Sequence, residues 1–394
     1  MMGYCMNNDF AKKFDENDED QTITERDQII YCGEPETVKQ IVRTDYNDFS
    51  KQAKKSQNLK NFDEQYTDIV DYIVKITHKI WEEKSIGLIY NTYHNDVKMH
   101  FGSQSTYGVQ AVVSGTLQTL YSFPDRKLVT QNVIWSENGN GYLSSHRIQS
   151  IATNLNDSSF GPVTNKKIEF RTTVECAVEN NRIYEEWLVR DNLSICEQLG
   201  FDPHVIAKSM AANSPNRGLK KVKCFGLDEN MNGQMVPEIY SAKDDSIGEY
   251  VLEMLSKIYN YRLFDQVKEF YTEQAVIHYI CDQDLVGYTQ IQGMLVNLFA
   301  SFPSADYIVE RVICNEDQES AETSVAVRWI LTGLHEGLGY FGKPSFKPVE
   351  IHGITHYTFS GKKIVEEWIT FDGLDVLKQI YEADGCCAAE EVNQ

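Results

Sequence analysis

The chain has 394 residues, a formal net charge of −21 at pH 7 and a hydrophobic fraction of 42%. This length accommodates two or three domains, and the hydrophobic fraction is ordinary for a globular protein. The negative charge repels phosphate backbones and anionic lipid headgroups, so we expect neither nucleic acid nor a membrane as a partner. Nine cysteines without a CxxC pair predict free thiols and a cytoplasmic protein.

In chain order, residues 1–60 begin with a polar, acidic stretch and predict a partly disordered arm, with a helix within residues 41–60. Residues 61–211 and 246–384 predict two domains. Residues 212–245 are rich in Gly, Pro, Asn and Asp, which indicates a linker. Residues 385–394 predict a loose tail.

The two predicted domains repeat one sequence pattern. Ile183 and Ile364 each begin the motif Ile-x-Glu-Glu-Trp-x-x-x-Asp. Upstream, "YHNDVKMHF" aligns with "YTEQAVIHY", which places His100 opposite His278. Similarity over a whole domain length indicates duplication of the domain.

Each repeat predicts the same elements. An amphipathic helix opens it, over residues 69–81 or 250–259, and a short helix and a brief strand follow. A third helix ends at Phe-Pro, and three long strands complete the unit. The segment "KIEFRTTVECAV" alternates apolar and polar residues, as expected for a strand with one packed face.

Several motifs resemble one known family. They are "SFP" after the third helix, "TGLHEG" at residues 332–337, and "FGKPSFKPVEIHGITHYTFSGKKIVEEW" after it. These resemble the SnoaL-like polyketide cyclases and ester cyclases of the nuclear transport factor 2 superfamily, over residues 66–205 and 247–383. The resemblance implies an α+β fold with two tandem cone-shaped barrels, each with N-terminal helices and a curved antiparallel sheet, packed as a pseudo-dimer. A pocket between sheet and helices is implied in each.

The resemblance also argues against the family's aldol reaction. Members that close rings in this way use an acid on the last strand and a histidine on the preceding strand. The acid position corresponds to Leu188 and Ile369 here, and the histidine position corresponds to Val174 and Thr355. None of these side chains can transfer a proton, so the aldol-cyclase pair is absent from both repeats.

Other residues remain as candidates for acid–base chemistry. Glu186 and Glu367 share strand parity with the missing acids, so their carboxyl groups are predicted to face the pockets. His100 and His278 occupy matching positions and supply imidazoles. We therefore expect the catalytic pair to be Glu367 with His278, in the better-preserved second repeat, or Glu186 with His100.

Six further residues are candidates for contacting substrate: Arg328, Trp329, His335, Tyr357, Arg147 and His146. An arginine in a pocket would bind a carboxylate or an enolate oxygen. The alternative is that Arg147 and Arg328 pair with carboxylates across the sheet.

His352 and His356 share a strand face with Glu350, which would suit a metal. We favour instead a polar interface between the repeats, with salt bridges such as Arg171 to Glu350, and predict no metal and no cofactor.

The sequence thus predicts a cofactor-free acid–base enzyme of the lyase, isomerase or cyclase type. Its expected partner is a small, largely apolar organic molecule, and the pseudo-dimer could dimerise further. The alternative is a non-catalytic small-molecule-binding protein or protein-interaction scaffold. A third reading has one active and one degenerate repeat.

Overall fold

The computed structural model describes residues 29–34, 38–39, 45–52, 57–214, 240–317 and 322–382. Most of the predicted arm, linker and tail lies outside these ranges. Within the arm, the described residues form a short strand, β1 (Ile30–Gly33), and a short helix, α2 (Tyr46–Lys51).

The first domain places helices before and between its strands. Its elements are α3 (Ile69–Trp81), α4 (Ile89–Thr92), β2 (Tyr93–Phe101), β3 (Gln104–Tyr107), α5 (Val109–Ser122), β4 (Lys127–Asn138), β5 (Gly141–Thr153), β6 (Lys167–Glu179), β7 (Arg182–Arg190), α6 (Asn192–Leu199) and α7 (Pro203–Ala212).

The second domain repeats this order. Its elements are α9 (Ile247–Leu255), α10 (Val267–Phe270), β8 (Tyr271–Tyr279), β9 (Gln283–Val286), α11 (Gly287–Ser301), β10 (Asp306–Asp317), β11 (Glu322–Leu334), β12 (Pro348–Ser360), β13 (Lys363–Phe371) and α12 (Gly373–Tyr381). The two predicted tandem α+β units are confirmed.

Each domain contains one curved sheet. The order is β3-β2-β7-β6-β5-β4 in the first and β1-β10-β11-β12-β13-β8-β9 in the second. Among the described strands neither sheet closes on itself, so each is an open cone rather than a closed barrel. Four long strands follow the third helix in each domain, not the predicted three, because residues 127–153 form a hairpin with its turn at Gly139.

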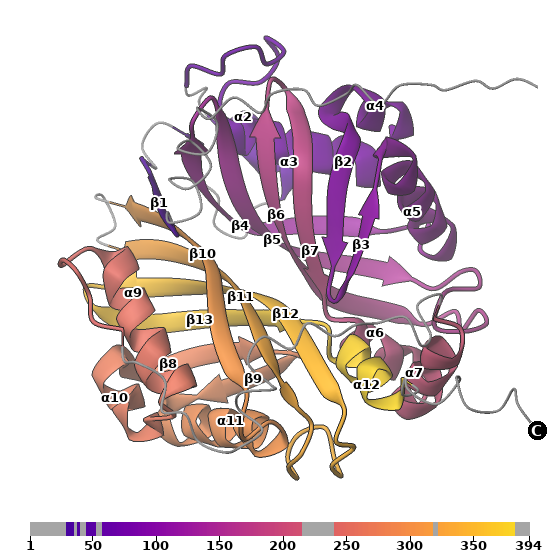
Figure 1. The fold of residues 1–394 in the computed structure, drawn as a ribbon. Coiled ribbons are helices and arrows are strands. Elements are labelled where there is room, and N and C mark those ends of the chain that lie inside the picture. The colour runs from indigo at the N-terminus through magenta and orange to yellow at the C-terminus, as the bar shows by residue number, and fades with distance from the viewer. Residues whose placement is uncertain are drawn as a thin grey trace, which may run out of the picture.

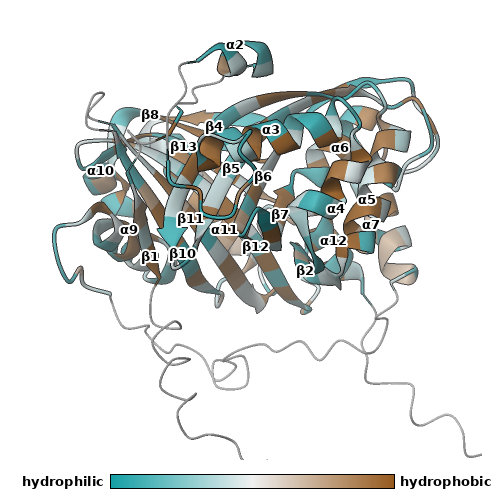
Figure 2. Cartoon of the chain, turned by 90° about the horizontal axis from the view of Figure 1, so that it is seen from above, coloured by the Kyte–Doolittle hydropathy of each residue, from teal (hydrophilic) through white to brown (hydrophobic). Residues whose placement is uncertain are grey.

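The long opening helix covers the concave face of the first sheet. The side chain of Asp68 caps α3 by accepting a hydrogen bond from the backbone N–H of Asp71. Residues of α3 alternate between hydrophobic and hydrophilic around the helix (Figure 2). Its buried side includes Ile69, Tyr72 and Ile73, which belong to the core of this domain.

The two sheets pack against each other within the chain, and α6, α7 and α12 gather at one end of this interface (Figure 1). Its centre is charged: Glu175 on β6 accepts hydrogen bonds from Arg311 at 2.6 Å and from Arg328 at 2.7 Å. Thr173 and Thr370 join their hydroxyls at 2.9 Å. A small apolar cluster completes the contact: Ile134, Leu143, Ala177, Ile313 and Ala326.

This arrangement confirms the polar interface between the repeats but not the salt bridge proposed for it. Arg171 donates to the backbone carbonyls of His278 and Ile369, at 3.0 and 3.1 Å. Glu350 instead contacts the ring of His352. Arg171 therefore bonds the backbone of the other domain.

Strand β1 belongs to the sheet of the second domain although it precedes the first. It pairs in parallel with β10, with Cys32 opposite Cys314. The backbone carbonyl of Cys32 also accepts a hydrogen bond from Ser136 on β4. Asn315 links the strands further, because its amide bonds the backbone N–H and carbonyl of Trp135 at 2.8 and 2.7 Å.

Candidate functional site

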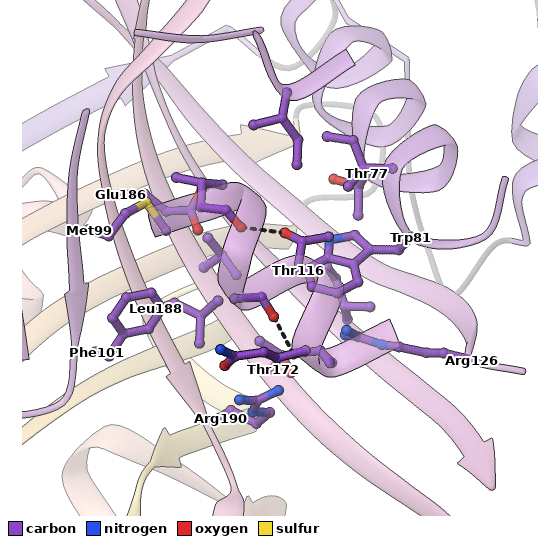
Figure 3. A pocket seen from close by; sticks show the side chains of 18 of the residues that line it. Thr77, Trp81, Met99, Phe101, Thr116, Arg126, Thr172, Glu186, Leu188 and Arg190 are labelled. Atoms are coloured by element: carbon purple, nitrogen blue, oxygen red, sulfur yellow. Dashed lines mark hydrogen bonds between the residues drawn. The ribbon is translucent and has the colours of Figure 1, made fainter. Parts of the chain in front are cut away.

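A cavity of about 300 Å³ lies in the first domain, between the concave sheet face and helices α3 and α5 (Figure 3). Its wall is mostly apolar, with residues such as Ile76, Val112 and Leu188. This volume lies at the lower end of the range for small-molecule pockets. Polar side chains such as Thr77, Gln118 and Ser158 share the wall with the apolar ones, so the cavity is a candidate ligand site.

Glu186 is the acidic residue that lines this cavity. It lies on β7, is 5% exposed, and accepts a hydrogen bond from the hydroxyl of Tyr93 at 2.8 Å. Burial raises the pKa of Glu186 to about 7, while the hydrogen bonds from Tyr93 and Cys176 act in the opposite direction. A carboxyl group with this pKa can exchange a proton near neutral pH.

His146 lines the same cavity from β5. Burial lowers the pKa of His146 to about 4, so its ring is neutral at physiological pH. Its Nδ1 has no hydrogen-bond partner among the described residues. In the sheet, β6 separates His146 from Glu186 and places Val174 and Cys176 between them. A ligand over β6 would therefore meet both side chains.

Two matching positions of the second domain carry larger, aromatic side chains: Ile148 corresponds to Trp329 and Cys176 to Tyr357. A third carries a smaller residue, because Thr172 corresponds to Gly353. A Cβ atom at Gly353 would lie 2.1 Å from the ring of Trp329, so glycine is needed there to admit the indole. The ring of Trp329 stacks on Tyr307 at 5.0 Å. Aromatic packing thus occupies the space that forms the cavity in the first domain.

Glu367, the counterpart of Glu186, lies within this aromatic packing. It is 0% exposed, and Tyr271 donates a hydrogen bond to it at 2.8 Å. Burial raises the pKa of Glu367 to about 7, against the hydrogen bond from Tyr271. The preference for the second repeat as the site rested on its motifs, whereas the cavity described here lies in the first.

His100 and His278 do not face the glutamates with which they were paired. In the register of β2 and β7, His100 lies opposite Trp187, whereas Met99 lies opposite Glu186. The imidazole of His100 therefore projects from the other face of the sheet, where its Nε2 lies 2.9 Å from Glu185.

His278 repeats this arrangement, with its Nε2 3.2 Å from Glu366 and its ring stacked on Trp368 at 3.5 Å. The predicted pairs His100–Glu186 and His278–Glu367 are therefore wrong. Side chains alternate along a strand, and each histidine lies on the face opposite its predicted partner.

Arg147 and Arg328 lie at the interface between the sheets instead of in a pocket. The guanidinium of Arg328 bonds Glu175 and Glu310 and lies 3.8 Å from the centre of the Trp187 ring. That of Arg147 lies 4.1 Å from the Trp368 ring. Both arginines occupy strand positions whose side chains face the other domain.

The remaining substrate-binding candidates lie in the second domain. Trp329 donates its indole N–H to the hydroxyl of Thr355 at 2.9 Å, and Tyr357 is buried beside Phe359. His335 is fully buried, and its Nδ1 lies 3.0 Å from the hydroxyl of Ser345. It braces the loop between β11 and β12.

Arg126 and Arg190 line the cavity but were not singled out in the sequence. Arg126 directly follows the Phe-Pro-Asp turn after α5, and Arg190 ends β7. Their counterparts in the second domain are Ala305 and Phe371. A search for charged residues that differ between the repeats would have found them.

Within the described ranges, no three His, Cys, Asp or Glu side chains are grouped so as to hold a metal ion. His356 lies in the interface, with its Nε2 2.9 Å from the hydroxyl of Ser145, while His352 contacts Glu350. None of the helices in the described part of the chain has the length and hydrophobicity to cross a membrane.

The buried Glu367 carboxyl makes stability depend on pH. Its pKa is raised from 4.5 to about 7. The contribution of Glu367 to the free energy of unfolding is therefore fully present below about pH 4.5 and is lost as the pH rises through about 7. Glu367→Gln is therefore expected to be more stable than the wild type at pH 8, by up to about 3 kcal/mol. Urea denaturation from pH 5 to pH 8 measures this difference.

The neighbouring Glu366 is the control, because its pKa is lowered to about 2, with burial opposed by the hydrogen bond from His278. Its contribution is present above about pH 4.5 and is lost only as the pH falls through about 2. Glu366→Gln should leave the slope between pH 5 and pH 8 unchanged. Equal slopes for Glu367→Gln and the wild type would contradict the prediction.

Comparison with known families agrees with this architecture. The family model described as SnoaL-like polyketide cyclase matches residues 71–199 and 249–380. The chain belongs to the SnoaL-like polyketide cyclase family, with one copy of the domain in each half. No curated protein matches the chain.

Solved structures of single domains resemble parts of the chain. One is a SnoaL-like polyketide cyclase from Jannaschia sp. CCS1, at 13% identity and a TM-score of 0.30, covering 34% of this chain and 94% of that one. Another is a polyketide cyclase from Acidithiobacillus ferrooxidans, at 19% identity and a TM-score of 0.29, covering 33% and 92%. A third is IdmH of Streptomyces antibioticus, described as a polyketide cyclase. It is 19% identical with a TM-score of 0.30, and the match covers 33% of this chain and 97% of that one.

Proposed function

We propose that the first domain is a cofactor-free acid–base enzyme of the lyase, isomerase or cyclase type. Its substrate is a small organic molecule with a largely apolar body, bound in the cavity between β7 and α5. The observation that carries this proposal is Glu186, a buried carboxyl with a pKa of about 7 in the wall of that cavity.

The roles of the cavity residues follow from their protonation states. In its ionised form, Glu186 accepts a proton from a carbon atom of the substrate. The hydroxyl of Tyr93 orients the carboxylate. His146 is neutral and can donate one ring N–H to an oxygen that becomes negative as the proton leaves. The second domain packs against the first through the interface, and the described residues that line the cavity all belong to the first domain.

The proposal is tested by following hydrogen exchange into carbon acids. The protein is incubated in deuterium oxide with small ketones, diketones and keto acids, and deuterium at the acidic carbon is measured by NMR. Catalysed exchange should rise with pH and level off above about 7, because Glu186 must be ionised to act.

Exchange no faster than in buffer for every compound would contradict the proposal. Tight binding without exchange would support the alternative of a non-catalytic binding protein, which the replacement of the aldol-cyclase pair by Leu188 and Val174 also favours.

A further inference from the structure

The cavity has a second charged region, away from Glu186. Arg126 is 6% exposed and lies between α5 and β4, with its guanidinium 4.4 Å from the centre of the Trp81 ring. Arg190 lies at the end of β7. In Figure 3 the two arginines lie on sides of the cavity different from that of Glu186.

Among the described residues, both guanidinium groups donate hydrogen bonds to neutral side chains. Arg126 donates from Nε and one Nη to the hydroxyl of Ser150, at 3.1 and 2.9 Å. Arg190 donates from Nε to the side-chain oxygen of Asn192 at 3.1 Å. The carboxylates whose charges act on these arginines are Glu82 for Arg126 and Asp372 for Arg190.

The positive charges of Arg126 and Arg190 also repel each other. Burial, and then the charge of Arg190, lowers the pKa of Arg126 to about 9, while the charge of Glu82 acts in the opposite direction. Burial lowers the pKa of Arg190 too, with Asp372 acting in the opposite direction. Arg126 is buried and Arg190 is half-buried, and their hydrogen bonds go to neutral groups. A bound anion would therefore offset part of the cost of removing the two cations from water.

The spacing along β7 fits one elongated ligand. Glu186, Leu188 and Arg190 alternate onto the cavity face of this strand. The Cα atoms of Glu186 and Arg190 are therefore about 13 Å apart along an extended strand. Leu188 supplies an apolar surface between the two ends.

We propose that the cavity binds an organic acid whose carboxylate pairs with Arg126 and Arg190 while its apolar body extends over Leu188 toward Glu186. The position of the reacting carbon at Glu186 rests on the proposed function. The carboxylate site itself rests on the arginines, and arginine forms paired hydrogen bonds with carboxylates. The second domain has Ala305 and Phe371 at the matching positions, so the two arginines are specific to the domain that contains the cavity.

The experiment compares acids with their neutral primary amides, which have nearly the same shape. Octanoate, cinnamate and naphthoate, each with its amide, are titrated into the full chain by calorimetry near neutral pH. At least one acid should bind about tenfold or more tightly than its amide. The variants Arg126→Gln and Arg190→Gln should remove this preference and leave amide binding unchanged, and Arg126→Lys should restore part of it.

Arg147→Gln is the matched control, because Arg147 lies in the same domain but faces Trp368 at the interface. It should keep the preference for acids. Equal affinity for acids and amides, no binding of any acid, or a preference that survives in both glutamine variants would overturn the inference. Binding needs no turnover, so acid binding without exchange would refute only the proposed function, and exchange confined to neutral ketones would refute only the inference.

Discussion

Glu186→Gln is expected to lower the catalysed exchange rate by about 10²–10⁴-fold, the usual contribution of a positioned general base. Glutamine has nearly the same volume as glutamate and can still accept the hydrogen bond from Tyr93. It cannot accept a proton from carbon. The loss should therefore appear in kcat with little change in KM, measured by initial rates on any compound that the wild type exchanges.

Glu367→Gln is the matched control for this variant. Glu367 has the same strand position, the same tyrosine partner type and a similarly raised pKa, but it is packed among aromatic side chains. Its replacement should leave the rate within about twofold of the wild type. Full activity in Glu186→Gln, or an equal loss in Glu367→Gln, would refute the assignment of Glu186.

Glu175→Gln is expected to destabilise the protein by about 3–5 kcal/mol, because it removes one partner of a buried charge network. The carboxylate of Glu175 is fully buried between Arg311 and Arg328 at the contact of the two sheets. Its loss leaves the half-buried guanidinium of Arg311 without this carboxylate. Chemical denaturation followed by fluorescence measures the free energy of unfolding.

Two further variants test whether the loss of stability comes from the charge network. Thr173→Val removes a neutral hydrogen bond to Thr370 at the same interface and should cost only about 1 kcal/mol. Adding Arg311→Gln to Glu175→Gln should recover part of the lost stability, because it removes the unpaired charge. A change below 1 kcal/mol for Glu175→Gln would show that the network does not hold the domains together.

The duplication and the orientation of the second glutamate in each pair could be predicted from sequence. The repeated Ile-x-Glu-Glu-Trp motif marks the last strand of each domain, and strand alternation places Glu186 and Glu367 on the inner face. The same alternation misplaced His100, because the relative phase of β2 and β7 depends on a register that neither strand encodes alone. The pairing of β2 with β7 determines the face of the sheet on which the His100 side chain lies.

The position of the cavity in the first domain could not be predicted from motifs. Whether a cavity forms depends on the summed volume of side chains from several elements, such as Ile148 or Trp329 with Thr172 or Gly353. In the motif-rich second domain, Trp329 replaces Ile148, and Gly353 gives its indole the room that Thr172 would deny it. Arg126 was missed for a related reason, since a lone arginine after a turn has no pattern until its neighbours in space are known.

Strand β1 crosses from the N-terminal side of the first domain to the sheet of the second. The second domain obtains its outermost strand from residues 30–33, which are synthesised before the whole first domain. A fragment that begins at residue 246 would leave the edge of β10 unpaired, and such an edge promotes aggregation. During synthesis on the ribosome, β1 cannot pair until β10 emerges, so this pairing joins two segments that are far apart in the sequence.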